Sequence, residues 1–418
     1  MSRRAVATLA MVLLLAGPAG AGAQPLAVRE LAAETPRLLQ ELARLRGVPI
    51  AGPSPRVVIR TREERRRFVL REFQRKYATG RLDAERRAMV AWGLIPPGFD
   101  LAGFLADLVL EQAAAYYDPV GKVMILANWL GREEQRDALT HELVHLLQDR
   151  QVDLDRFLGL PAGRGDEALA RQTIVEGEAV ALTLDRTLRR QGQDLGDIPD
   201  VAAVQQAIVT SATGPVLGRA PRFVRSLLTF PYARGLGFVH QFRRRHGWAE
   251  FSRLYADPPR STTQILHPER YLERREDPVP VTLPDLGPLL GGARLLIDDV
   301  AGEFGFSGIL SEGLGETATA TAAGWRGDRY AVWEDGAAST ILVSLSVWES
   351  DAAATAFADA YGRVLRRKHG LPASPETAWT VAGRAFGVER RGAEVLLFGG
   401  VPAATLEAVR RASWQTRR

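Results

Sequence analysis

The sequence predicts an α+β protein in which an edge strand or hairpin precedes a mostly helical core and a small C-terminal α+β sandwich follows it. Three observations predict this class. Apolar residues recur at helical spacing over much of residues 24–276, strand-like alternation is concentrated in residues 293–418, and residues 277–292 between them are rich in proline and glycine. The chain has 418 residues, of which 46% are apolar, so it is long enough to build more than one core.

Residues 1–23 have the pattern of a secretory signal peptide. Arg3 and Arg4 precede a short apolar run, and small residues precede Gln24. The apolar run is shorter than the ~20 residues that cross a bilayer, so we expect cleavage near Ala23 and Gln24, with an uncleaved anchor as the alternative. The protein is therefore expected to be exported, to the periplasm or outside the cell, and to have no permanent membrane span.

The charge of the chain argues against a nucleic-acid partner. Without Arg3 and Arg4 the sequence has 52 basic and 49 acidic residues, so the mature surface is nearly balanced. Arginines crowd residues 56–87, and such a stripe is one way to follow a phosphate backbone. The aromatic and apolar residues among them fit one buried stripe, however, which favours an amphipathic helix. Its stripe consists of Phe68, Val69, Phe73 and Tyr77.

The elements of the first 276 residues follow from spacing and turn signals. Residues 24–100 are predicted to form a mostly helical lead-in and residues 101–276 the core. Helical spacing is clearest at 28–45, 101–112, 132–149 and 166–190, and less clear through 201–255. A short strand is expected at 56–60, and two more within 113–126, around a turn at Asp118-Pro119-Val120-Gly121.

The C-terminal residues 293–418 follow a predicted linker at 277–292, where prolines remove backbone donors. Strands are expected at 328–333 and 339–347, then a helix at 352–368, two further strands, and a helix at 403–413. This order predicts a small α+β sandwich.

The stretch DALTHELVHLLQD places His141, Glu142 and His145 in one predicted helix. Histidines four residues apart lie on one side of a helix, so both imidazoles can reach a single ion. Leucines at 139, 143, 146 and 147 form the opposite stripe, which predicts that the leucines are buried and the histidines face outward. The alternative is a chance histidine pair on a solvated face.

A metal site here needs a third ligand. The chain has no cysteine, so any metal must be bound by His, Asp or Glu, and a catalytic zinc site uses three protein ligands and one open position. Glu176 and Glu178 lie in the predicted helix at 166–190, about 200° apart, so only one of them can face the metal.

HELVH followed by EGEA on a second helix resembles the gluzincin metallopeptidases, whose signature is HExxH with a downstream glutamate. The resemblance covers about residues 112–190 and implies a zincin-like core that binds Zn²⁺ through His141, His145 and Glu176. The separation of His145 and Glu176 is longer than in the best-known members and requires a larger loop at 151–165. The stretches FPYARGLGFVHQF and STTQILHPERYL further resemble uncharacterised exported bacterial proteins with the same two motifs.

The expected chemistry is hydrolysis of a peptide or protein substrate. A Zn²⁺ ion in this site lowers the pKa of a water towards ~7 and polarises the scissile carbonyl. Glu142 points about 100° around the helix from His141, where it can act as general base and then general acid. The oxyanion needs a donor, and we expect His267 to supply it. The candidates considered are Tyr232, His240, His246 and His267.

Three further expectations concern the surroundings of this site. Asp149 is predicted either to orient a ligand imidazole or to meet solvent at the helix end. Glu178 and Asp185 are interpreted as an ordinary acidic pair. The strand pair at 113–126 is either an ordinary hairpin or an edge that pairs with an extended substrate. The alternative to a peptidase is a non-catalytic envelope binding or scaffolding protein whose metal site is structural or degenerate.

Overall fold

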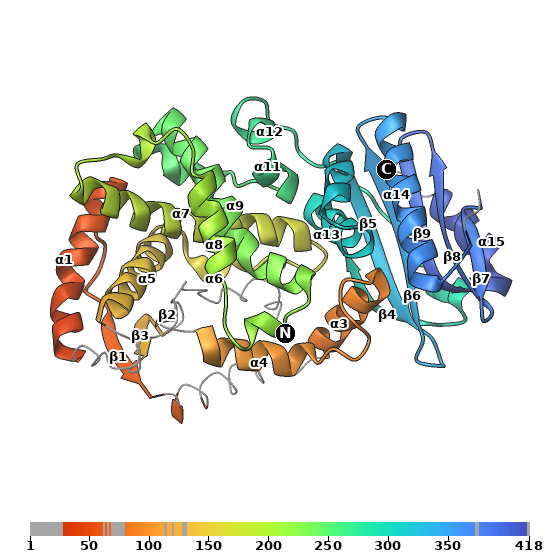
Figure 1. Cartoon of the computed structure of the whole chain (residues 1–418), viewed down its shortest axis with the longest axis horizontal. Coiled ribbons are helices and arrows are strands. Elements are labelled where there is room, and N and C mark those ends of the chain that lie inside the picture. The colour runs from red at the N-terminus through yellow and green to blue at the C-terminus, as the bar shows by residue number, and fades with distance from the viewer. Residues whose placement is uncertain are drawn as a thin grey trace.

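Figure 1 shows the computed structural model, which describes residues 28–61, 63–64, 67, 80–112, 115–118, 121–127, 132–372 and 376–415. The protein has the predicted α+β class, with a helical part and an antiparallel sheet side by side along the long axis. The predicted signal peptide lies outside the described residues, and so does the apolar stripe of the predicted arginine helix, which consists of Phe68, Val69, Phe73 and Tyr77. Among the helices that are described, none combines the length and apolar character needed to cross a membrane.

The helical part contains the helices and the strand predicted from spacing. The predicted segments at 28–45, 56–60, 101–112, 132–149 and 166–190 correspond to α1, β1, α4, α5 and α7. The elements of this part are α1 (Val28–Arg46), β1 (Arg56–Arg60), α3 (Arg81–Trp92), α4 (Leu101–Gln112), β2 (Ala115–Asp118), β3 (Val123–Ala127), α5 (Arg132–Val152), α6 (Leu154–Leu158), α7 (Gly165–Arg190), α8 (Ala202–Ser211), α9 (Arg222–His246), α10 (Ser252–Ala256), α11 (Thr262–Leu266) and α12 (Glu269–Leu272).

The three strands of this part form a small sheet in the order β1-β3-β2. Strand β1 is parallel to β3, and β2 is antiparallel to it, as expected for a hairpin. Pro119 and Val120 of the predicted turn lie outside the described residues. Strand β2 is therefore one of the two edges of the described sheet, and it lies against α5.

Helices α7 and α9 cross at two glycines next to the candidate ligand Glu176. A Cβ atom on Gly177 would lie 2.5 Å from the carbonyl carbon of Gly235, and one on Gly235 would lie 2.5 Å from the carbonyl oxygen of Thr173. Any larger residue at either position would push the helices apart. The glycine of the EGEA motif therefore has a packing role: it lets α9 press against α7 beside Glu176.

The C-terminal part is one six-stranded antiparallel sheet in the order β4-β5-β6-β9-β8-β7. The predicted order of four strands and two helices is present as β5, β6, α14, β8, β9 and α15, and β4, α13 and β7 are additional. The elements are β4 (Arg294–Asp299), α13 (Gly302–Leu314), β5 (Trp325–Glu334), β6 (Thr340–Trp348), α14 (Asp351–His369), β7 (Ala378–Val381), β8 (Arg384–Arg391), β9 (Glu394–Pro402) and α15 (Leu406–Trp414).

Both faces of this sheet are covered. Val332 and Leu342 pack on one side with α13 and α14, whereas Trp333 and Ile341 pack on the other side with α15. This alternation has the period of two that a strand imposes on its side chains. The segment 277–292, predicted as a linker, also packs on the α15 side, where it buries two leucines, Leu286 and Leu290.

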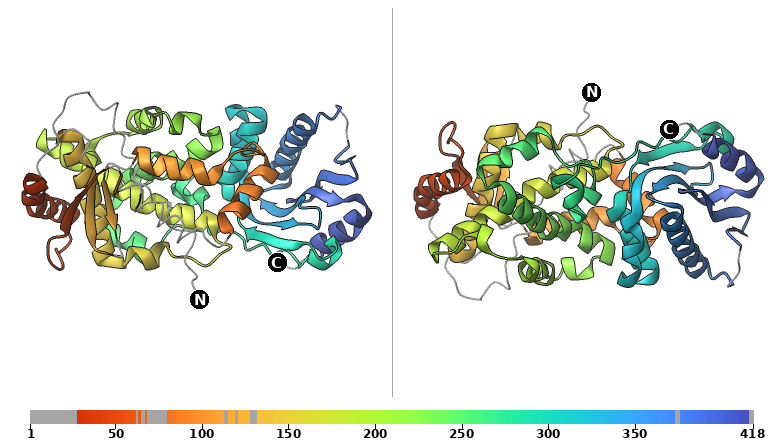
Figure 2. Two further views of the ribbon diagram at one scale, coloured as in Figure 1. Left: turned by 90° about the horizontal axis from the view of Figure 1, so that it is seen from below. Right: turned by 90° about the horizontal axis from the view of Figure 1, so that it is seen from above.

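The two parts share a packed joint. Helix α3, shown in orange in Figure 2, reaches the sheet and places Trp92 edge-on against Phe306, with ring centroids 5.9 Å apart. The start of α7 is held by the end of β4, because the backbone N–H of Gly165 donates to Asp299 at 2.6 Å. The helix that carries Glu176 is therefore anchored at its first residue on the C-terminal part.

Candidate metal centre

The structure brings His141, His145 and Glu176 together. The Nε2 atoms of the two imidazoles lie 3.2 Å apart, and Glu176 Oε2 lies 3.4 Å from each of them. Helix α5 supplies the histidines and α7 supplies the glutamate, and the two helices lie side by side (Figure 1). All three side chains are buried, and their donor atoms converge on one point, so they could hold a metal ion.

The expectation that the histidines face outward is wrong. His141 and His145 are only 6% and 7% exposed, and the leucine stripe on the other side of α5 is buried as well. The leucines pack within the core of the helical part, while α7 covers the histidine side. The helix is therefore enclosed on both faces, and the metal site lies in the interior rather than on a solvated surface.

Three carboxylate oxygens in this interior lack a hydrogen-bond partner among the described residues: Glu142 Oε1 and both oxygens of Glu176. A buried carboxylate that is left without a partner costs several kcal/mol, roughly the desolvation penalty of the group. Neighbouring positive charge lowers this cost. The arrangement is therefore one that a cation between the three ligands would stabilise.

The proximity of the imidazoles and the Glu176 carboxylate also shifts the pKa values of both kinds of group. Burial favours the neutral imidazole of His145, but the adjacent Glu176 carboxylate outweighs burial and raises the pKa of His145 to about 9. Burial also favours the neutral form of Glu176, yet the two imidazoles lower its pKa to about 2. Without a metal the site therefore holds an imidazolium–carboxylate pair at neutral pH, and a metal must displace that proton.

Glu142 is held by the edge strand. The backbone N–H of Tyr117 in β2 donates to Glu142 Oε2 at 2.6 Å, which leaves Oε1 as the free oxygen. Burial is the main influence on this group and raises the pKa of Glu142, against the lowering effect of the two histidines. The strand predicted upstream of the metal helix thus fixes one oxygen of the carboxylate that follows His141.

Gln148, a residue that belongs to no recognised motif, orients His145. Its amide nitrogen donates to Val175 O at 2.9 Å and to Glu178 Oε2 at 2.8 Å, two groups that can only accept. The amide oxygen must therefore face His145 Nδ1, which lies 2.7 Å away. Nδ1 then carries a hydrogen, so in the neutral ring Nε2 is the nitrogen whose lone pair can bind a metal on the side of Glu176.

Glu178 supports this arrangement, so its interpretation as one member of an ordinary acidic pair is incomplete. It forms a buried ion pair with Arg46 at the end of α1 and accepts a hydrogen bond from the Tyr255 hydroxyl. Arg46 also donates to the carbonyl of Trp248 at 2.7 Å. The prediction that only one glutamate faces the histidines is confirmed, because the other anchors the glutamine that holds His145.

Asp149 does not have the imidazole-orienting role considered for it. Its carboxylate accepts hydrogen bonds from the Tyr117 hydroxyl at 2.8 Å and from the backbone N–H of Leu154 at 3.1 Å, and it pairs with Lys122. It is buried rather than exposed to solvent. Asp149 therefore ties the end of α5 to the hairpin, and its neighbour Gln148 contacts the imidazole.

The four candidate oxyanion donors lie in different surroundings. The ring of Tyr232 in α9 stacks on His141, with centroids 6.3 Å apart. His267 Nε2 lies 2.8 Å from Glu303 in α13, and His240 Nε2 lies 3.0 Å from the carbonyl of Ile198. His246 ends α9, where its ring packs on Phe242. Among the contacts of the described residues, Tyr232 is the one of the four whose ring lies against a candidate ligand.

Comparison with known proteins reaches only the C-terminal part. Neither a curated protein nor a solved structure matches the chain. Residues 294–410, which run from the start of β4 into α15, match the family model of a domain of unknown function (DUF8575).

Proposed function

We propose that the protein is an exported zinc-dependent peptidase that hydrolyses peptide bonds with Glu142 as general base. One observation carries the proposal: two imidazole nitrogens and one carboxylate oxygen converge at separations of 3.2, 3.4 and 3.4 Å, directly beside a carboxylate with a free oxygen. The signal-like N-terminus supports export.

The spacing of the three ligand atoms fits zinc. Ligands at 2.0–2.1 Å from a tetrahedral ion are about 3.3–3.4 Å from one another, which matches the three observed separations. The donor set has three protein ligands and no cysteine, which is the composition of catalytic rather than structural zinc sites. When bound, Zn²⁺ would supply a Lewis acid that polarises a peptide carbonyl and lowers the pKa of a water.

Glu142 would move the protons. Its Oε2 is fixed by the Tyr117 N–H, so Oε1 is available to take a proton from the attacking water and to deliver it to the leaving amine. Burial raises the pKa of Glu142, which brings it closer to that of the groups with which it exchanges the proton. Glu142 needs no movement of α5 for this role, because it follows the ligand His141 in the same helix.

Tyr232 is the proposed hydrogen-bond donor to the oxyanion, because its ring lies against His141. His267, expected from the sequence, is 28% exposed at its side chain and engaged with Glu303. Pairing of an extended substrate with the edge strand β2 stays a prediction.

A peptide-library digest together with metal analysis tests the proposal. Wild-type protein should cleave peptides and bind one zinc, and Glu142→Gln should keep the zinc and lose at least a hundredfold in rate, as the loss of a general base implies. Cleavage that survives in Glu142→Gln would contradict the assigned base. A wild-type protein that binds zinc but cleaves no library member would favour the non-catalytic envelope protein instead.

A further inference from the structure

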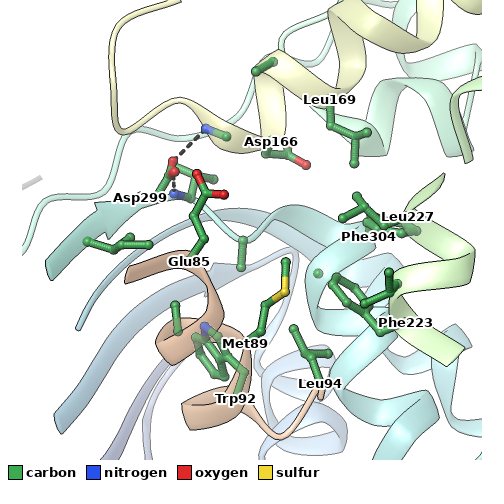
Figure 3. A pocket seen from close by; sticks show the side chains of 18 of the residues that line it. Glu85, Met89, Trp92, Leu94, Asp166, Leu169, Phe223, Leu227, Asp299 and Phe304 are labelled. Atoms are coloured by element: carbon green, nitrogen blue, oxygen red, sulfur yellow. Dashed lines mark hydrogen bonds between the residues drawn. The ribbon is translucent and has the colours of Figure 1, made fainter. Parts of the chain in front are cut away.

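A cavity of about 270 Å³ lies at the joint between the helical part and the C-terminal sheet (Figure 3). Its wall is mainly apolar and is built by side chains from α3, α7, α9 and α13, including Met89, Leu169, Leu227 and Phe304. These four side chains are only partly buried. Apolar side chains that stay accessible around a concave space are typical of a binding site rather than of a packing fault in a core.

The cavity begins next to the metal centre. Tyr232 lines it and also stacks on His141. Gln172 lines it too, and it lies four residues before Glu176, on the same side of α7 and one turn away. A substrate with its carbonyl at the metal centre can therefore place a neighbouring side chain along α7 and α9 into the cavity.

The size of the cavity suits a large side chain. An apolar protein cavity of about 150 Å³ already binds benzene, so 270 Å³ accommodates a phenylalanine or leucine side chain with room for its attachment to a backbone. Trp92 and Phe223 provide aromatic surfaces on the wall opposite α7, as Figure 3 shows.

The carboxyl groups at one end of the cavity disfavour anionic amphiphiles. Glu85 and Asp299 lie close together there, and Asp166 lies between them and Leu169 (Figure 3). Arg81 pairs with Glu85, so the carboxylates outnumber the cation at this end. A fatty acid or a phospholipid would bring its own negative group towards these carboxyl groups and be repelled by those that are ionised. A peptide carries no such group on its side chain when that side chain is apolar.

We propose that this cavity is a specificity subsite that receives a large apolar side chain of a peptide bound at the metal centre. The turn between β4 and α13, which supplies Val300 and Ala301, and Phe304 in α13 make the C-terminal part a wall of the subsite. The proposal rests on the proposed function for the position of the peptide backbone. It assigns to the part that contains the DUF8575 match a role in substrate selection.

The test measures binding and turnover separately in the full chain. Two blocked hexapeptides that differ only in one central residue, phenylalanine or alanine, are titrated by calorimetry into zinc-loaded Glu142→Gln protein, with decanoate as a third probe. Leu169→Trp fills the cavity, and Leu184→Trp is the matched control because Leu184 is a partly buried leucine at the other end of α7. Trp92 fluorescence, assigned with Trp92→Phe, reports occupancy of the cavity directly.

The phenylalanine peptide should bind at least tenfold more tightly than the alanine peptide and change Trp92 fluorescence. Leu169→Trp should reduce this preference below twofold, and Leu184→Trp should preserve it. Equal affinity for the two peptides, equal loss in both variants, or binding of decanoate but not of the phenylalanine peptide would overturn the proposal. If the preference is found but active protein cleaves neither peptide, the proposed function fails and the subsite stands. If active protein cleaves the phenylalanine peptide and Leu169→Trp does not change the rate, the subsite proposal fails and the proposed function stands.

Discussion

Replacing Gln148 by alanine should weaken zinc binding although all three ligands stay in place. The wild-type amide fixes His145 Nδ1 as the protonated nitrogen, because its own nitrogen is already committed to Val175 O and Glu178. Without the amide oxygen the imidazole is free to rotate or to exchange its tautomer, and Nε2 no longer keeps its lone pair directed at the ion. Loss of such an outer hydrogen bond typically lowers metal affinity about 10–100-fold, which corresponds to about 1.4–2.8 kcal/mol.

The same substitution should also lower the stability of the metal-free protein. Gln148 is fully buried, and its removal leaves the Val175 carbonyl and one hydrogen-bond position of Glu178 without the amide donor. A buried group that loses its partner costs about 1–3 kcal/mol. Glu178 retains its bonds to Arg46 and Tyr255, so the total loss of stability from the two groups should lie in the lower part of their combined range, at about 2–4 kcal/mol.

Zinc affinity is measured by competition with a chromophoric chelator, and stability by urea unfolding of the metal-free chain. The matched control is Gln151→Ala, one turn further along α5, where the glutamine donates to Leu147 O and accepts from the Ser252 hydroxyl, away from the candidate ligands. This control should leave the zinc affinity unchanged. A Gln148→Ala protein that binds zinc within twofold of wild type would refute the reasoning about tautomer and orientation.

Three further predictions concern protons and the oxyanion. Because the pKa of His145 is raised to about 9 in the metal-free site, zinc binding at pH 7.5 should release about one proton, and apparent affinity should rise about tenfold per pH unit up to about pH 9. Calorimetry in two buffers of different ionisation enthalpy measures this, and a heat independent of buffer would contradict it. Burial raises the pKa of Asp166 from 3.8 to about 7, so the contribution of this carboxyl group to the stability should be most favourable below pH 4 and should fall by up to about 4 kcal/mol as the pH rises through 7. Asp166→Asn should flatten this part of the pH profile in urea unfolding, and an unchanged slope would count against the assignment. Tyr232→Phe should lower kcat at least tenfold at an unchanged zinc content. An unchanged kcat would contradict the role of Tyr232 and favour His267 as the oxyanion donor.

The ligand histidines were predictable because their geometry is local. A helix places residues four apart on one side whatever surrounds it, so His141 and His145 could be paired before any tertiary contact was known. The direction in which they face was not predictable. The leucine stripe indicated one buried face, but α7 also encloses the opposite face, and periodicity within one helix carries no information about a second neighbour.

The hydrogen-bond partner of His145 was missed for a related reason. Gln148 carries no charge and belongs to no sequence motif, and its role depends on Val175 and Glu178 in another helix. The same holds for Glu178, whose spacing from Glu176 showed that it faces elsewhere but not what it meets there. Only the position of α1 reveals that Arg46 balances its charge.

In the C-terminal part, the strands with clear alternation were predicted and the edges were not. Strands β4 and β7 lie at the two ends of the sheet. Strand β7 is short, and β4 has only partly buried and exposed residues. Edge strands bury less of their surface, so their patterns are weaker. The proline-rich segment before β4 has no regular strand or helix pattern, yet its four leucines still pack on the sheet, two of them buried.

The zinc content of wild type, Glu176→Ala and Glu178→Gln after dialysis against limiting zinc tests the central claim most directly. We predict one ion per chain in the wild type and in Glu178→Gln, and less than a tenth of an ion in Glu176→Ala. A wild-type chain that retains no zinc, or a Glu176→Ala chain that retains a full equivalent, would contradict the assignment of the three ligands.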